Sequence, residues 1–132
     1  MASIHNDIPL DAPARAVWDA VRDFGALHLR LVPGFVTACE LDGDARIVTF
    51  SNGSVAREVL VDCDETRQRL VYAISNERLK HYSASVQVVA DVADKSRLLW
   101  TIDMLPNELA LYVEQTKLAV LAMHRAFPPA AR

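Results

Sequence analysis

The stretch Asp11-Ala-Pro-Ala-Arg-Ala-Val-Trp-Asp-Ala-Val-Arg-Asp-Phe24 decides the fold of this 132-residue chain. It follows residues 3–10, in which apolar and polar side chains alternate as they do along a half-buried strand. Within the stretch, Val17, Trp18 and Val21 recur at helical spacing and define one apolar face. The sequence therefore predicts a strand, a tight turn and a short amphipathic helix at the start of the chain.

The boundaries of this helix have recognisable signals. Asp11 belongs to the residue types that cap helix N-termini, and Pro13 suits a first helical turn. Gly25 interrupts the helix, and residues 27–31 are predicted to form a second short helix that ends at Pro33. Two short helices are therefore expected between the first strand and the second.

Six further strands and one long helix are predicted in the rest of the chain. The strands show alternating polarity or short apolar runs, and they cover residues 35–41, 46–50, 55–62, 70–74, 82–92 and 98–104. Turn signals such as Asn52-Gly53 make the links short, which favours antiparallel pairing. Residues 109–127 follow a helical period, with Asn107 as a cap and with Leu118 and Leu121 widening the apolar stripe.

These elements predict a single α+β domain over residues 1–132, with helices packed on one face of an antiparallel sheet. Hydrophobic residues make up 52% of the chain, which indicates a large core or a cavity lined by apolar groups. The net charge of −3 is scattered along the chain, which argues against nucleic-acid binding. No segment approaches the ~20 apolar residues of a membrane span, and signal-peptide features are absent, so a cytoplasmic protein without integral membrane association is predicted.

Metal and nucleotide sites lack their sequence signatures. Cys39 and Cys63 have no second cysteine at zinc or redox spacing, so two buried free thiols are expected. The four histidines are far apart, and the four glycines are isolated in turns. We therefore predict neither a metal site nor a cofactor.

The order of the motifs resembles that of a known protein group. Asp11-Ala-Pro-x4-Val17-Trp18, followed by Asp23-Phe24-Gly25-x-Leu27-His28, resembles the SRPBCC, or START-like, superfamily and within it the polyketide cyclase/dehydrase-like branch. Phe50-x2-Gly53-x3-Arg57-Glu58-x-Leu60, Tyr82-x-Ala84-x-Val86 and Trp100-x5-Pro106 are similar to later strands of that branch. The resemblance covers about residues 3–125.

This resemblance implies a helix-grip fold. In that fold a curved, seven-stranded antiparallel sheet wraps a long C-terminal helix around a deep, mostly apolar cavity. Members of the group bind lipids, steroids, hormones or polyketides, and some catalyse cyclisation or dehydration. In plant hormone receptors of the group, a glutamate at the position of Glu58 lines the cavity.

Glu58 is the main candidate for acid–base chemistry, and two orientations are open. If Leu60 points inward, Glu58 does too, because strand side chains alternate. An inward carboxylate has a raised pKa unless it is paired, and it can then exchange a proton with a ligand. In the other orientation, Glu58 pairs with Arg57 or Arg46 on an outer face.

Tyr72, Tyr82 and Trp100 are expected to share the inner surface, where each offers apolar area and one polar group to a ligand or to ordinary core packing. His28 lies beside the expected entrance and is either an acid–base group or a surface histidine. The candidate catalytic residues are Glu58, His28, Tyr72 and Tyr82. The predicted ligand-binding residues are Leu27, Leu31, Phe35, Phe50, Glu58, Tyr72, Tyr82, Trp100, Val120 and Met123.

The leading functional hypothesis is binding of a small hydrophobic or amphipathic ligand, such as a lipid, steroid or polyketide-like molecule, between the sheet and the C-terminal helix. The alternative is a polyketide cyclase, dehydrase or aromatase that uses acid–base residues of the cavity. A third hypothesis is an accessory domain that docks another protein through a sheet edge or helix. The chain is expected to be a monomer or a homodimer.

Overall fold

Seven strands and three α-helices make up the protein, as seen in a computed structural model. The structure describes the backbone of residues 2–74, 81–105 and 109–128, and the side chains of residues 3–74, 81–105 and 116–128. The elements are β1 (Ala2–Leu10), α1 (Ala14–Arg22), the 3-10 helix η1 (Phe24–Ala26), α2 (Leu27–Arg30), β2 (Val36–Asp42), β3 (Ala45–Phe50), β4 (Val55–Asp64), β5 (Arg69–Ile74), β6 (His81–Ala90), β7 (Ser96–Leu105) and α3 (Leu109–Ala126).

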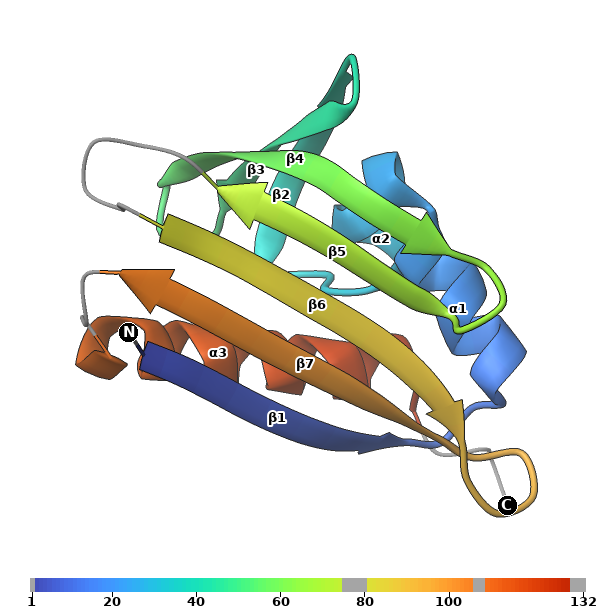
Figure 1. Cartoon of the computed structure of the whole chain (residues 1–132). Coiled ribbons are helices and arrows are strands. Elements are labelled where there is room, and N and C mark those ends of the chain that lie inside the picture. Colours follow the sequence, from blue (N-terminus) through green and yellow to red (C-terminus); the bar gives the residue numbers. More distant parts are fainter. Residues whose placement is uncertain (1, 75–80, 106–108, 129–132) are drawn as a thin grey trace.

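All seven strands form one antiparallel sheet in the order β1-β7-β6-β5-β4-β3-β2. Figure 1 shows the sheet curving over the long helix α3, which runs along β7 and β1. The helices α1 and α2 pack on the same face, α1 against β6 and β7 and α2 against β2. This arrangement is the helix-grip fold, so the predicted fold class is confirmed. The predicted turns at Gly43 and Gly53 are also present, and both glycines have positive φ angles of 63° and 87° that favour this residue type.

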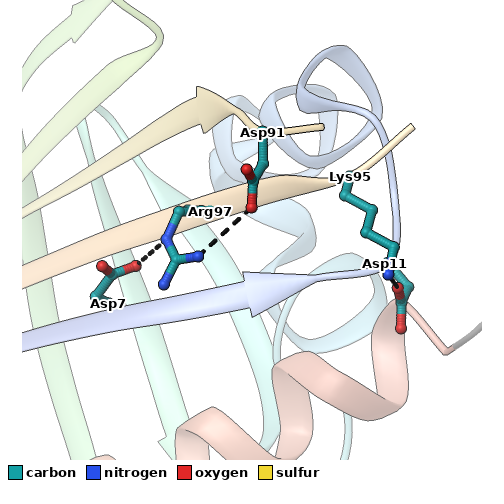
Figure 2. A network of polar contacts seen from close by, with 5 residues as sticks. All are labelled: Asp7, Asp11, Asp91, Lys95 and Arg97. Atoms are coloured by element: carbon teal, nitrogen blue, oxygen red, sulfur yellow. Dashed lines mark hydrogen bonds and ion pairs between the residues drawn. The ribbon is translucent and has the colours of Figure 1, made fainter. Parts of the chain in front are cut away.

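Strand alternation separates the inner face of the sheet from the outer face. On β6 and β7, every second residue is buried and faces the core beneath the helices; these residues are Tyr82, Ala84, Val86, Val88, Leu98, Trp100, Ile102 and Met104. The residues between them lie on the outer face, which carries an ion-pair network of Arg97 with Asp7 and Asp91 (Figure 2).

The expected capping role of Asp11 is wrong. Pro13 occupies the N-cap position in an extended conformation (φ −66°, ψ 151°), and no side chain caps α1. The carbonyl oxygen of Pro13 accepts the first helical hydrogen bonds, at 3.0 Å from Ala16 N and 3.2 Å from Val17 N. The N-cap thus lies two residues later than expected, and the Asp11 carboxylate instead pairs with Lys95 Nζ at 3.3 Å (Figure 2).

The apolar stripe of α3 also differs from the prediction. Leu118 and Leu121 are 53% and 55% exposed, so they lie on the outside of the helix. The buried face of the described part of α3 carries Thr116, Ala119, Ala122 and Met123. Asn107 and the side chains of residues 109–115 lie outside the described residues.

No helix in the described part of the chain combines the length and apolar character that crossing a bilayer requires.

Candidate functional site

Five neighbouring strands each place one large polar or aromatic side chain on the inner face of the sheet. The residues are Arg46 on β3, Glu58 on β4, Tyr72 on β5, Tyr82 on β6 and Trp100 on β7, and as whole residues they are 4%, 4%, 6%, 7% and 8% exposed. We call this set the inner row. The three aromatic residues therefore share the inner surface as the alternation predicts.

Arg46 and Glu58 form a buried ion pair at one end of the inner row. They are direct partners in the β3–β4 register, and Glu58 Oε1 lies 2.8 Å from Arg46 Nε and 2.7 Å from Nη2. Arg46 also donates a hydrogen bond of 3.3 Å to the carbonyl oxygen of Phe24. Its guanidinium lies 4.1 Å from the ring centre of Phe24 and 5.2 Å from that of Tyr72, within cation–π range.

The two open orientations of Glu58 are thereby resolved. Glu58 points inward, and its partner is Arg46, but the pair lies on the inner face and not on the outer one. Arg57, the other possible partner, instead lies 3.4 Å from Asp42 Oδ2 at the surface. The buried carboxylate is thus already engaged by a cation of the same chain.

Burial sets the proton affinity of the inner row. It raises the pKa of Glu58, while the charge and hydrogen bond of Arg46 oppose this rise. Burial also raises the pKa of Tyr72, and the nearby Glu58 carboxylate adds to this shift. Arg46, Trp100 and Tyr82 oppose it without cancelling it. Tyr72 therefore keeps its hydroxyl proton across the physiological pH range.

The other end of the inner row is rich in hydrogen-bond donors. The rings of Tyr72 and Tyr82 lie 6.4 Å apart with an interplanar angle of 36°. Trp100 Nε1 is buried and makes no hydrogen bond within the described residues. Asn6, which is the direct partner of Trp100 in the β1–β7 register, has a buried Nδ2 that is likewise without an acceptor there.

The remaining predicted ligand-binding residues lie in or against the same hydrophobic core as the aromatic residues of the inner row. Leu27 and Leu31 are buried around α2, Met123 is buried on α3, and Val120 is half-buried against the core. Phe35 and Phe50 pack edge to face with ring centres 5.4 Å apart. Phe35 also borders a shallow surface depression of about 70 Å³, whose other lining residues are Gly34, Ser51, Leu118, Leu121 and Arg125.

The histidines do not join the inner row. His28 is half-buried on α2, and its Nδ1 is buried without a hydrogen-bond partner in the part of the chain that the structure describes. His5, His81 and His124 are exposed to solvent. Of the candidate catalytic residues, the fold thus brings together Glu58, Tyr72 and Tyr82 and leaves His28 apart.

Two residues of this region were not among the predicted site residues. Arg46 lies two positions before the buried Val48, and Asn6 lies between Ile4 and Ile8. Strand alternation places both on the inner face, so this signal was available in the sequence. Cys39 and Cys63 are free, as expected, but only half-buried, and within the described ranges no group of histidine, cysteine, aspartate or glutamate residues could hold a metal ion.

Comparison with known families agrees with this architecture. Residues 1–127 match the family described as polyketide cyclase / dehydrase and lipid transport. The chain belongs to this family. The sequence of this chain matches no curated protein.

Solved structures show the same fold at low sequence identity. The protein XoxI from Bacillus cereus is 20% identical with a TM-score of 0.84, and the match covers 96% of both chains. A START superfamily protein from Mycobacterium smegmatis is 12% identical with a TM-score of 0.73, covering 94% of this chain and 92% of the other. Norcoclaurine synthase from Thalictrum flavum, in complex with dopamine and hydroxybenzaldehyde, is 21% identical with a TM-score of 0.70, covering 95% of this family member and 84% of the synthase.

Proposed function

We propose that this protein binds a small, mainly apolar molecule between the inner row and α3. The observation that carries the proposal is the inner row itself, in which Arg46, Glu58, Tyr72, Tyr82 and Trp100 come from five neighbouring strands and are almost fully buried. A core that serves packing alone favours aliphatic side chains, and it uses tyrosine and tryptophan where their polar groups reach partners. An apolar surface with a few placed polar groups is typical of small-molecule sites.

The composition of α3 supports the same proposal. Its described inward side chains are mostly small, with Thr116, Ala119 and Ala122 buried, while Leu118 and Leu121 face outward. Small side chains opposite large aromatic ones suit a ligand that lies against the rings. Val120 lies at the edge of this helix face and is only half-buried, although it packs against the core. We therefore place one side of the ligand at Val120.

Catalysis is the second candidate, and one observation favours it. The fold is shared with norcoclaurine synthase, whose structure was solved with dopamine and hydroxybenzaldehyde. A polyketide cyclase, dehydrase or aromatase reaction would need at least two acid–base groups that converge on one bound atom. Glu58 is held by Arg46, and the raised pKa of Tyr72 makes this phenol a poor base. These two features lead us to prefer binding over catalysis.

A matched pair of substitutions on α3 tests the binding proposal. Val120→Phe is expected to fill the ligand space, and Leu121→Phe places the same ring on the exposed side of the helix. Thermal shift with ethylnaphthalene, progesterone and oleate measures ligand binding in each variant. We expect at least one probe to raise the melting temperature of the wild type and of Leu121→Phe, but not that of Val120→Phe.

A tightly filled core gives a different result. None of the probes then stabilises the wild type, and Val120→Phe lowers the stability by the about 1–3 kcal/mol that is typical of overpacking. That outcome contradicts the proposal.

A further inference from the structure

The donor-rich end of the inner row points to the chemistry of the ligand. We propose that Trp100, with Tyr72 beside it and Asn6 opposite it, binds an electrically neutral ligand through a carbonyl-type oxygen that accepts hydrogen bonds. This inference rests on the proposed function, and it adds the part of the ligand that the site recognises and the charge that the site excludes.

The indole N–H of Trp100 is the central feature. Trp100 is 8% exposed, and its Nε1 has no hydrogen-bond partner among the described residues. A buried donor without an acceptor destabilises the folded protein, so a native structure usually pairs it. An indole nitrogen can only donate, and the missing partner must therefore be an acceptor atom.

Trp18 shows what a satisfied indole looks like in the same protein. Its Nε1 donates a hydrogen bond of 2.8 Å to Glu65 Oε2, and its side chain is also almost fully buried. The two tryptophans of the chain thus differ in one respect: the indole of Trp18 has a protein acceptor, and that of Trp100 has none within the described chain.

The groups around Trp100 can donate as well, although the phenol oxygen of Tyr72 can also accept and lies near enough to the indole for Trp100 to oppose the rise in the Tyr72 pKa. Burial raises the pKa of Tyr72, so its phenol remains protonated and can donate. Asn6 is paired with Trp100 across β1 and β7, and its buried Nδ2 also has no acceptor among the described residues. Side chains at directly paired positions lie on the same face of a sheet, so both unpaired donors face α3. No atom of the described residues accepts the Trp100 or Asn6 proton in hydrogen-bond geometry, and a ligand oxygen would supply that acceptor.

The charges of the inner row argue for a neutral ligand. Its cation, Arg46, and its carboxylate, Glu58, lie 2.7 Å apart and neutralise each other. A buried carboxylate on the ligand would find no unpaired cation in the inner row, and burial of an unpaired charge is strongly unfavourable. A buried ammonium group would meet the same difficulty. A ketone, quinone, lactone or amide oxygen accepts hydrogen bonds without carrying a charge.

Three naphthalene derivatives of similar size separate these properties. Acetylnaphthalene carries a neutral acceptor, ethylnaphthalene carries none, and naphthoate carries a negative charge. Their affinities are measured by isothermal titration calorimetry for the wild type, for Trp100→Phe and for the control Trp18→Phe. We expect Trp100→Phe to weaken acetylnaphthalene about threefold to tenfold, as the loss of one hydrogen bond does. The same substitution should change the affinity for ethylnaphthalene by less than about twofold. The wild type should bind naphthoate at least about tenfold more weakly than acetylnaphthalene.

NMR provides a readout that does not depend on how the variants fold. The two indole N–H groups give two resonances in the spectrum of the nitrogen-labelled wild type, and Trp18→Phe identifies them. Acetylnaphthalene should move the Trp100 resonance downfield, in the direction of hydrogen bonding, whereas ethylnaphthalene should not. The Trp18 resonance should stay in place with both probes, because its donor already has an acceptor.

Several results would overturn the inference and leave the proposed function intact. In the first, Trp100→Phe weakens the binding of acetylnaphthalene and of ethylnaphthalene equally. In the second, the wild type binds naphthoate more tightly than acetylnaphthalene. In the third, the Trp100 resonance does not shift when acetylnaphthalene binds. An Asn6→Leu substitution that shifts the Trp100 resonance upfield without ligand would show that Asn6 Oδ1 already accepts its proton, and this also overturns it. If none of the three probes binds, the proposed function fails, and the present inference fails with it.

Discussion

Two clusters of arginine and carboxylate groups lie on opposite faces of the same sheet, and they have nearly the same contact geometry. On the inner face, Arg46 Nη2 lies 2.7 Å from Glu58 Oε1, and the two side chains are 5% and 6% exposed. On the outer face, Arg97 Nε lies 2.8 Å from Asp7 Oδ1, and these side chains are 39% and 55% exposed (Figure 2). The comparison shows that two ion pairs with similar contact distances can contribute very differently to the stability of the protein.

Water explains the difference between the two clusters. If one member of the outer network is removed, solvent hydrates the charges that remain, so exposed pairs contribute little. If Arg46 is removed, Glu58 stays inside the protein without its counter-ion, and the stability lost is large. The outer network also links Arg97 to Asp91 at 3.4 Å, which gives it one more contact but no more burial.

The largest effect is expected from Arg46→Met. The substitution keeps apolar volume but leaves Glu58 buried and unpaired, and the free energy of unfolding should fall by about 3–5 kcal/mol near neutral pH. Urea unfolding followed by circular dichroism measures this change. Loss of stability by less than about 1 kcal/mol would contradict the burial of the pair.

The pH dependence of Arg46→Met provides its control. Without Arg46, the attraction that opposes the raised pKa of Glu58 is gone, so the folded state holds the Glu58 proton more tightly than the unfolded state. The stability of the variant should therefore recover as the pH falls toward the unfolded-state pKa of glutamate, and it should be lost as the pH rises through the folded-state pKa. Arg46→Met combined with Glu58→Gln has no carboxylate at this position. It should regain most of the stability and lose this pH dependence.

A smaller effect of opposite sign is expected from Asn6→Leu. The change removes a buried amide donor that has no partner in the described chain and replaces it with apolar volume on the inner face. The free energy of unfolding should rise by about 1 kcal/mol, because an unsatisfied buried donor is destabilising. His5→Leu, on the neighbouring outer position, removes a solvated group and should give no such gain. A clear loss of stability in Asn6→Leu would show that this amide is satisfied in the free protein.

The smallest effect is expected from Arg97→Met. Its partners Asp7 and Asp91 are hydrated once the guanidinium is gone, so the urea midpoint should not change measurably in moderate salt. Raising the ionic strength should reduce any residual difference from the wild type, because salt screens exposed charges. A decrease as large as that of Arg46→Met would remove the distinction between the two faces.

The fold could be predicted because β6 and β7 alternate clearly in burial and because the order of the motifs resembles that of a known protein group. The inward direction of Tyr72, Tyr82 and Trp100 follows from a period of two, and the same period places Arg46 and Asn6 beside them. The face of α3 was harder to predict, because Leu118 and Leu121 fit an apolar stripe as well as the alanines do. In the folded protein, Ala119 and Ala122 are buried, whereas Leu118 and Leu121 are exposed.

The candidate site could be predicted only in part from the sequence. Alternation made Glu58 a candidate for the inner face, but the choice between Arg46 and Arg57 as its partner depends on the β3–β4 register, which pairs Arg46 with Glu58. The lack of partners for Trp100 and Asn6 depends on where every nearby acceptor lies. Such an absence is a property of the assembled fold and has no local sequence signal.

The pairing of β1 with β7 affects the order in which the chain can fold during its synthesis. Ala2 pairs with Met104 and Leu10 with Ser96, so β1, which is synthesised before the other strands of this sheet, can pair only after β7 has been made. The strands β2 to β6 pair with their neighbours in sequence and can assemble earlier as local hairpins. A nascent or truncated chain that ends before Ser96 therefore exposes two unpaired edges, β1 and β6, each with an apolar face that favours aggregation.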